Sequence, residues 1–307
     1  MSDLPFSLEN LKNNLKAKGR LIPFASAQAA IENEQQTLNR DTKYLHPSEI
    51  AKRDWCPRSS MYDILGYAPE KTKSFGFQTL NIFQTGHDIH AKWQGWLQRS
   101  GILKQAELPI FSEEYHIKGN ADGLLEDGNG QAILEIKSVG AGSVRFENFE
   151  LYKEYESGQI THDGLWKKIR QPFSSHLRQL NLYMFCTGIH NGIFLYEWKA
   201  TSAIKEFEVT FQRSIIEPIL ASCLLVKKAL SNGTIVPRPI WAETIEHKTC
   251  KQCAHKEKCW KDPDHANGFP IIEHPSNAIV LKEVFTSRPS EGSDSTDTPA
   301  LRRLVRK

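Results

Sequence analysis

The middle of the chain holds three consecutive segments in which apolar and polar residues alternate. They are ELPIFSEE at residues 107–114, EYHIKGNADGLLED at 114–127 and QAILEIKSV at 131–139. Such alternation is typical of strands with one buried face. The sequence DGNG at 127–130 separates the last two segments and predicts a tight hairpin. The pattern therefore predicts a sheet at the centre of the fold.

Helical patterns surround these strands. Gly101 and Gly188 are placed to end two of the helices. The expected elements are a helix at 79–99, the three strands, a helix at 172–187, strands at 191–200 and 204–212, and a helix at 214–230. This order predicts an α/β (α+β) fold in which helices flank a mixed central sheet.

Changes in composition along the chain suggest its organisation. Residues 1–43 are polar and read as a helical N-terminal arm, and residues 44–240 hold the patterned core. A cysteine module follows at 241–285. Residues 286–307 are rich in Ser, Pro, Thr and Asp, and we expect them to form a disordered tail with a basic end. Residues 140–170 resist assignment.

Composition also limits the function classes. No apolar run approaches the ~20 residues that a membrane span needs, and the N-terminus lacks an apolar signal core. We therefore expect a cytoplasmic protein that does not enter membranes. The net charge is only +3, so any binding of nucleic acid must depend on local patches.

One group of chemically capable residues surrounds the predicted hairpin. Glu135 and Lys137 are two positions apart on one strand and therefore share a face, and the hairpin brings Asp122 beside them. Two carboxylates that face one space repel each other unless a cation neutralises them. Mg²⁺ or Mn²⁺ suits such oxygen ligands. The alternative is three solvated side chains on an exposed sheet face.

Two helices carry further candidates. His90, or His87 one turn earlier, could complete a metal shell, and a nitrogen ligand favours Mn²⁺ over Mg²⁺. Gln179 and Tyr183 are four residues apart and share a helix face, from which they could hold a phosphate or the lysine. Each of these patterns also has an ordinary reading, as a packed histidine and an amphipathic helix.

Together these motifs resemble the PD-(D/E)xK nuclease superfamily, and in particular its RecB-like nucleases and CRISPR-associated four-cysteine iron-sulfur exonucleases. The matching segments are GHDIH at 86–90, GNADG at 119–123, EIK at 135–137 and QLNLY at 179–183. The family's leading proline is absent, since Ala121 precedes Asp122. The resemblance runs from Cys56 to Cys259, about two thirds of the chain.

The resemblance implies a restriction-endonuclease-like core and a role for each matched residue. Asp122, Glu135 and His90 would be metal ligands, and the backbone carbonyl of Ile136 would also face the metal. Gln179 and Tyr183 would orient Lys137 or contact DNA. The implied function is a metal-dependent DNA nuclease, an exonuclease acting on single-stranded ends in recombination, repair or phage and CRISPR DNA processing. A bacterial, archaeal or viral source (in an infected host) is implied only by this resemblance.

The cysteines form a second constellation. Cys250, Cys253 and Cys259 are spaced C-x2-C-x5-C, and Cys56 is the candidate fourth ligand. Spacing alone leaves an iron-sulfur cluster and structural Zn²⁺ near even, and for zinc His255 could replace Cys56. The family resemblance implies that the four cysteines hold a [4Fe-4S] cluster. The remaining two, Cys186 and Cys223, are expected in the core.

Contacts with DNA are the least constrained part of the prediction. Lys167, Lys168 and Arg170 are candidate phosphate contacts. Base stacking is one hypothesis for Trp93, Trp96 and Trp166, with core packing as its rival. The basic C-terminal tail could bind nucleic acid or a protein partner, and a purely solubilising role is the alternative. The alternative function is a catalytically inactive or partner-dependent DNA-binding subunit with a zinc-stapled nuclease fold.

Overall fold

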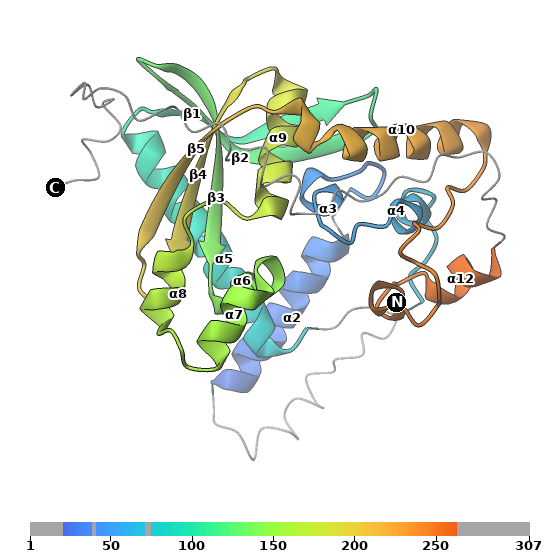
Figure 1. The fold of residues 1–307 in the computed structure, drawn as a ribbon, viewed down its shortest axis with the longest axis horizontal. Helices are drawn as coiled ribbons and strands as arrows, with labels where there is room; N and C mark the ends of the chain where they lie inside the picture. Colours follow the sequence, from blue (N-terminus) through green and yellow to red (C-terminus); the bar gives the residue numbers. More distant parts are fainter. Residues whose placement is uncertain (1–20, 39–40, 71–74, 263–307) are drawn as a thin grey trace.

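The computed structural model describes residues 21–38, 41–70 and 75–262 of the chain. The predicted α+β class, a mixed central sheet flanked by helices, is confirmed (Figure 1). The predicted C-terminal tail at 286–307 and residues 1–20 and 39–40 of the predicted arm lie outside the described residues. Within the described ranges no helix is both long and apolar enough to cross a membrane.

The elements lie close to their predicted positions. The strands are β1 Leu103–Ser112, β2 Ile117–Asp127, β3 Gly130–Val139, β4 Asn191–Trp198 and β5 Ile204–Thr210. The longer helices are α2 Ile22–Leu38, α5 Phe77–Arg99, α9 Ser174–Thr187 and α10 Glu217–Asn232. The shorter ones are α3 Pro47–Ile50, α4 Pro57–Ile64, α6 Ala141–Glu147, α7 Phe149–Glu156, α8 His162–Lys168, η1 Arg213–Ile215, α11 Lys248–Lys251 and α12 Lys256–Lys261.

The five strands form one sheet in sequence order. Pairing is antiparallel except between β3 and β4, which run parallel because α6 to α9 connect them. Asp127 pairs with Gly130, so the predicted β2–β3 hairpin is present with a two-residue turn. β3 therefore lies at the centre of the sheet, between an antiparallel and a parallel neighbour.

Different helices cover the two faces of the sheet. Ile89 of α5 packs on Leu103, Leu134 and Ile136 in a small cluster on one face. The larger cluster lies on the other face, where Leu177 and Leu180 of α9 join the residues of α10 and the opposite side of β3 and β4. α9 is therefore held against the sheet along most of its length. α5, by contrast, buries only Leu80 and Ile89.

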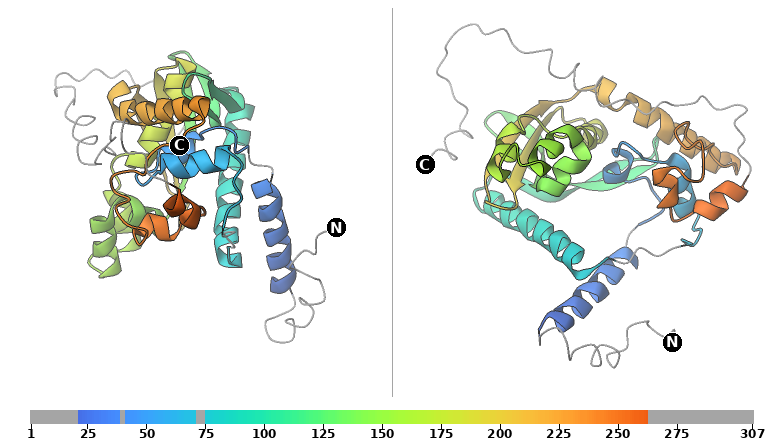
Figure 2. Two further views of the ribbon diagram at one scale, coloured as in Figure 1. Left: turned by 90° about the vertical axis from the view of Figure 1, so that its right-hand side faces the viewer. Right: turned by 60° about the horizontal axis from the view of Figure 1, so that its bottom comes forward.

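Residues 140–170, unassigned from the sequence, form three short helices, α6 to α8. Asn148 and Thr161 begin α7 and α8 by accepting hydrogen bonds from backbone N–H groups three residues on, at 3.1 Å each. α2 lies beside α5 and projects from the rest of the molecule (Figure 2). Within the predicted N-terminal arm, residues 22–38 are thus helical.

The cysteine module packs on α4 near the start of the core (Figure 1). Arg58 of α4 is fully buried and donates hydrogen bonds to the backbone carbonyls of Val236, Cys259 and Asp262. Its phenolic neighbour Tyr62 donates to the carboxylate of Asp262 at 3.0 Å. These hydrogen bonds, made by protein atoms alone, connect segments about 200 residues apart in the chain.

A glycine allows α9 to approach the sheet. A β-carbon at Gly192 of β4 would lie 2.8 Å from Cδ2 of Leu180, which is fully buried. We predict that Gly192→Ala lowers the free energy of unfolding by about 1–3 kcal/mol, because the packed interface must shift. Urea denaturation measures this change.

Gly142→Ala is the matched control, since a β-carbon at this position in α6 would meet nothing within 4 Å. This variant should be neutral or up to about 1 kcal/mol more stable than the parent protein, because alanine favours helix. Equal stabilities for the two variants would contradict the close approach of α9 to β4.

Candidate active site

The candidate site lies where β2 and β3 separate. Their pairing runs from Asp127 with Gly130 to Gly123 with Leu134, and Asp122 and Glu135 come next on the two strands. At this fork the backbone N–H of Ile136 bonds to a side chain in place of a backbone carbonyl of β2. It donates to Oδ2 of Asp122 at 2.6 Å. The side chain of Asp122 therefore faces Glu135 across the fork.

His90 joins this pair from α5. Its Nδ1 lies 3.1 Å from Oδ1 of Asp122, so both oxygens of that carboxylate are engaged. Burial disfavours a charge on the imidazole, but the hydrogen bond and charge of Asp122 outweigh this and raise the pKa of His90. His87, the alternative candidate, is exposed and is not part of this contact.

Glu135 is a buried carboxylate with one oxygen unsatisfied. Its side chain is only 3% exposed; Oε1 pairs with Nζ of Lys137 at 2.7 Å, whereas Oε2 has no hydrogen-bond partner among the described residues. Burial and then repulsion by Asp122 raise the pKa of Glu135, and Lys137 partly offsets them. A buried oxygen of this kind costs stability unless a cation or donor meets it.

α9 orients Lys137. Gln179 accepts a hydrogen bond from Nζ of Lys137 at 3.0 Å through its Oε1, and its Nε2 donates to the hydroxyl of Tyr183 at 2.8 Å. Lys137 is thus held between Glu135 and Gln179. The structure brings together all six predicted side chains, namely His90, Asp122, Glu135, Lys137, Gln179 and Tyr183.

The donor set of the fork fits a divalent cation. Asp122 and Glu135 offer carboxylate oxygens, which are the ligands that Mg²⁺ and Mn²⁺ prefer. Oε2 of Glu135 has no hydrogen-bond partner in the described part of the chain and is therefore free to coordinate a cation. In the arrangement of the described residues, however, no three His, Cys, Asp or Glu side chains lie where they could together hold one metal ion. In this arrangement His90 and Lys137 occupy the carboxylate oxygens that a cation would share.

Two polar residues next to the fork were missed from the sequence. Nε2 of Gln94 on α5 donates to the carbonyl oxygen of Asp122 at 2.9 Å and to Oε1 of Glu107 at 2.8 Å. Glu107 has a φ of 50°, which is uncommon for a residue other than glycine. It also lies close enough to Tyr183 for its charge to raise that group's pKa. Its place opposite Asp122 depends on a register shift in β1, which no sequence pattern signals.

The predicted DNA contacts lie apart from the fork. Lys167, Lys168 and Arg170 are exposed at the end of α8, and Lys168 is paired with Glu154. The stacking hypothesis for Trp166 is wrong, because this side chain is 7% exposed and its ring stacks on Trp198 in the core.

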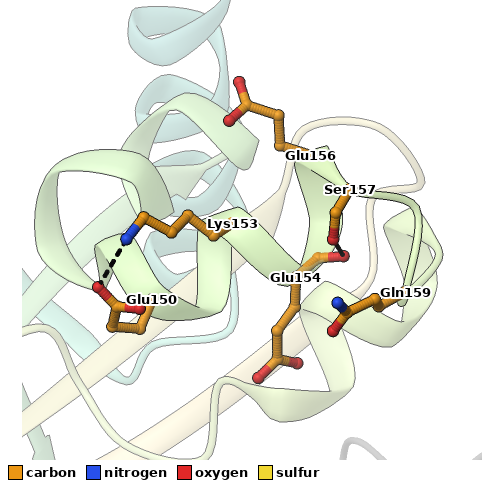
Figure 3. A pocket seen from close by; sticks show the side chains of 6 residues that line it. All are labelled: Glu150, Lys153, Glu154, Glu156, Ser157 and Gln159. Atoms are coloured by element: carbon orange, nitrogen blue, oxygen red, sulfur yellow. Dashed lines mark hydrogen bonds and ion pairs between the residues drawn. The ribbon is translucent and has the colours of Figure 1, made fainter.

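The other two tryptophans differ from each other. Trp93 donates its indole N–H to the buried Glu197 at 2.6 Å, whereas Trp96 is half exposed. A hollow of about 560 Å³ lies on the surface of α7 and the turn after it (Figure 3). Its lining residues are Glu150, Lys153, Glu154, Glu156, Ser157 and Gln159, none of which is a candidate site residue.

The candidate cysteine ligands come from the start of α4 and from the C-terminal module, and among the described residues no three of them are placed to hold one metal ion. Burial, together with the charges of Cys253 and Cys259, raises the pKa of Cys56 to about 12. Burial also raises the pKa of Cys250 and of Cys259. The charge of Cys253 raises both pKa values further in the same direction. The backbone N–H of His255 donates to Sγ of Cys253 at 3.4 Å. Each thiolate raises the pKa of its neighbours, so ionising them together requires a compensating positive charge.

One ring nitrogen of His255 contacts a carboxylate, and the other has no hydrogen-bond partner among the described residues. It is 1% exposed; its Nε2 lies 2.8 Å from Oδ1 of Asp63, and its Nδ1 has no hydrogen-bond partner among the described residues. The alternative zinc ligand therefore remains chemically able to bind a metal. Cys223 is fully buried in the core. Cys186 of α9 is partly buried and packs against that core, as predicted for both.

Comparisons with known proteins add likenesses of fold only. No protein-family model and no curated protein matches the sequence. The solved structures that match include that of SSO0001, which is 15% identical, with a TM-score of 0.43, covering 78% of this chain and 96% of that chain.

They also include an alkaline exonuclease, LHK-Exo, from Laribacter hongkongensis, alone and in complex with dAMP. Both of these chains are 13% identical, with a TM-score of 0.40, covering 62% of this chain and 89% of that chain. Likenesses at this level say nothing about activity, which must be inferred from the side chains of the site.

The unsatisfied oxygen of Glu135 generates a prediction about metal binding. Mn²⁺ present at 100 times its dissociation constant should stabilise the protein by about 2.7 kcal/mol, because only the folded site binds it. Glu135→Gln should abolish this gain, whereas Glu126→Gln on the exposed end of β2 should retain it. Thermal denaturation with and without Mn²⁺ measures both, and an undiminished gain in Glu135→Gln would place the metal elsewhere.

Proposed function

We propose that this chain is a metal-dependent DNA nuclease of the PD-(D/E)xK type that hydrolyses phosphodiester bonds. The observation that carries the proposal is the buried, unsatisfied oxygen of Glu135 between Asp122 and Lys137. A fold that placed these residues for stability alone would have no reason to bury a carboxylate next to another. Two carboxylates and a lysine at one fork are suited to phosphate chemistry.

The side chains divide the work of hydrolysis. Asp122, Glu135 and His90, with the carbonyl of Ile136, would hold Mg²⁺ or Mn²⁺, which lowers the pKa of a bound water and neutralises charge on the phosphate. The backbone N–H of Ile136 fixes the orientation of Asp122. Gln179 and Tyr183 fix the position of the Lys137 ammonium, which then orients the attacking water or stabilises the negative charge that develops on the phosphate.

The substrate we propose is single-stranded DNA, cut from its ends during recombination, repair or phage and CRISPR DNA processing. The motif resemblance to RecB-like nucleases supports this choice. Lys167, Lys168 and Arg170 on the exposed end of α8 are proposed phosphate contacts. A protein partner bound through the basic C-terminal tail stays a prediction about residues outside the described ranges.

We further propose that Cys56, Cys250, Cys253 and Cys259 hold a [4Fe-4S] cluster. Their mutual electrostatic influence and the N–H donor on Cys253 support a shared centre. The cluster would add to the contacts that Arg58 already makes across the same interface. The open Nδ1 of His255 favours the alternative, a structural zinc site of the Cys₃His kind.

Loss of Lys137 should remove activity without removing the fold. We expect Lys137→Ala to lower kcat at least about 100-fold, because the attacking water and the phosphate charge lose their positioned cation. The assay is cleavage of end-labelled single- and double-stranded DNA with Mn²⁺ or Mg²⁺, using protein purified without oxygen.

Lys104→Ala is the control, since Lys104 is an exposed lysine on β1. This variant should cleave as the parent protein does. A parent protein that cleaves no DNA under these conditions would contradict the proposed function and favour a binding subunit.

The cluster proposal predicts the metal content of the purified protein. Anaerobically purified protein should be brown and contain iron and acid-labile sulfide, and Cys56→Ser should lose both because one of four thiolates is missing. Cys186→Ser should retain them, since Cys186 lies on α9 away from the module. A colourless protein with one zinc per chain, unchanged in Cys56→Ser and lost in His255→Ala, would establish the zinc alternative instead.

A further inference from the structure

His176 shares the helix face that serves the candidate site. It precedes Gln179 by three residues and Tyr183 by seven on α9, spacings that place all three on one side of a helix. Gln179 and Tyr183 use that side to hold Lys137. Gln179, one turn from His176, accepts a hydrogen bond from Nζ of Lys137 at 3.0 Å, so the imidazole lies on the side of α9 that faces the lysine.

The sheet beneath His176 is continuous with the site. In the parallel pairing of β3 and β4, Lys137 lies beside Tyr196 and Glu135 beside Phe194. The ring of His176 lies 5.4 Å from that of Tyr196 and 6.5 Å from that of Phe194, measured between centroids. His176 therefore lies over β4, next to the strand that carries the proposed catalytic residues.

The hydrogen bonds of Tyr196 determine the tautomer of His176. The Tyr196 hydroxyl is buried and accepts the backbone N–H of Phe173 at 3.0 Å. Its own proton needs an acceptor, and Nδ1 of His176 lies 2.5 Å away. Nδ1 therefore accepts, and the ring proton is on Nε2.

The imidazole is a neutral donor with an accessible nitrogen. Burial, with the positive charges of Lys137 and Arg178, lowers the pKa of His176 well below its usual value. His176 is nevertheless only half-buried, and Nε2 is not among the buried unsatisfied atoms of the described residues. No described side chain accepts its proton. The Nε2–H group thus has no hydrogen-bond partner among the described residues and is not completely buried.

We propose that Nε2–H of His176 binds a non-bridging phosphate oxygen of the DNA strand in the site, as an uncharged partner to Lys137. This inference rests on the proposed nuclease function and adds a substrate-binding residue to it. A neutral donor fixes the position of a phosphate by direction, whereas the lysine attracts it by charge. Tyr196 is a positioning residue, because it holds the imidazole in the donating tautomer.

The variants His176→Ala and His176→Gln separate binding from packing. His176→Ala should weaken single-stranded DNA binding about 10-fold, measured with Ca²⁺ in place of the catalytic metal, because a hydrogen bond to a charged oxygen is lost. His176→Gln keeps an uncharged N–H donor and should recover most of the affinity. With Mn²⁺, His176→Ala should raise KM by a similar factor and leave kcat within about 2-fold.

The salt dependence of binding provides an independent readout. A neutral contact releases no counterion, so the slope of log Kd against log salt should be the same for His176→Ala and the parent protein. Lys167→Ala is the comparison: if this lysine contacts a phosphate, the slope falls by about 0.7 for single-stranded DNA. A reduced slope in His176→Ala would show a charged contact and overturn the proposal.

Other outcomes are equally decisive. A parent protein that cleaves DNA while His176→Ala binds it with unchanged affinity and KM overturns the role of His176 alone. Losses in His176→Ala that His176→Gln fails to restore, with a lowered melting temperature in both, indicate packing and also overturn it. A parent protein that neither binds nor cleaves DNA rejects the proposed function, and this inference with it.

Discussion

The burial of the Glu135 carboxylate on the central strand is the constraint on which the site depends. A carboxylate this deep needs compensation, and Lys137 meets only one of its oxygens. Asp122 increases the demand, because a second negative charge lies across the fork. The need for a cation is therefore built into the sheet itself, and the hairpin between β2 and β3 is what creates it.

Helix α9 holds Lys137 in place beside the two carboxylates, Asp122 and Glu135. Its apolar side packs on the sheet through Leu177 and Leu180, and its polar side carries Gln179 and Tyr183 to Lys137. Gly192 permits the close approach on which this alignment depends. Packing and chemistry are thus coupled, since a small movement of α9 would release the lysine from its position.

Much of this arrangement could be predicted from the sequence, because alternation, helical spacing and one tight turn are local patterns. They predicted five strands, the hairpin and the face shared by Glu135 and Lys137. The place of Glu107 was not predictable, since it depends on a register shift and a positive φ. The sequence could not decide between base stacking and core packing for Trp166, because its stacking partner, Trp198, lies 32 residues away on β4. α6 to α8 are too short for periodicity to show.

The most direct test of the central claim is the position of the metal. Crystals grown with Mn²⁺, measured for anomalous scattering, would locate the ion independently of any activity. We predict a peak at the fork of β2 and β3, at coordination distance, about 2.1 Å, from oxygens of Asp122 and Glu135. Lys137 would then have moved away from Oε1 of Glu135. A fork in which the Glu135–Lys137 pair persists with no anomalous peak would contradict the account.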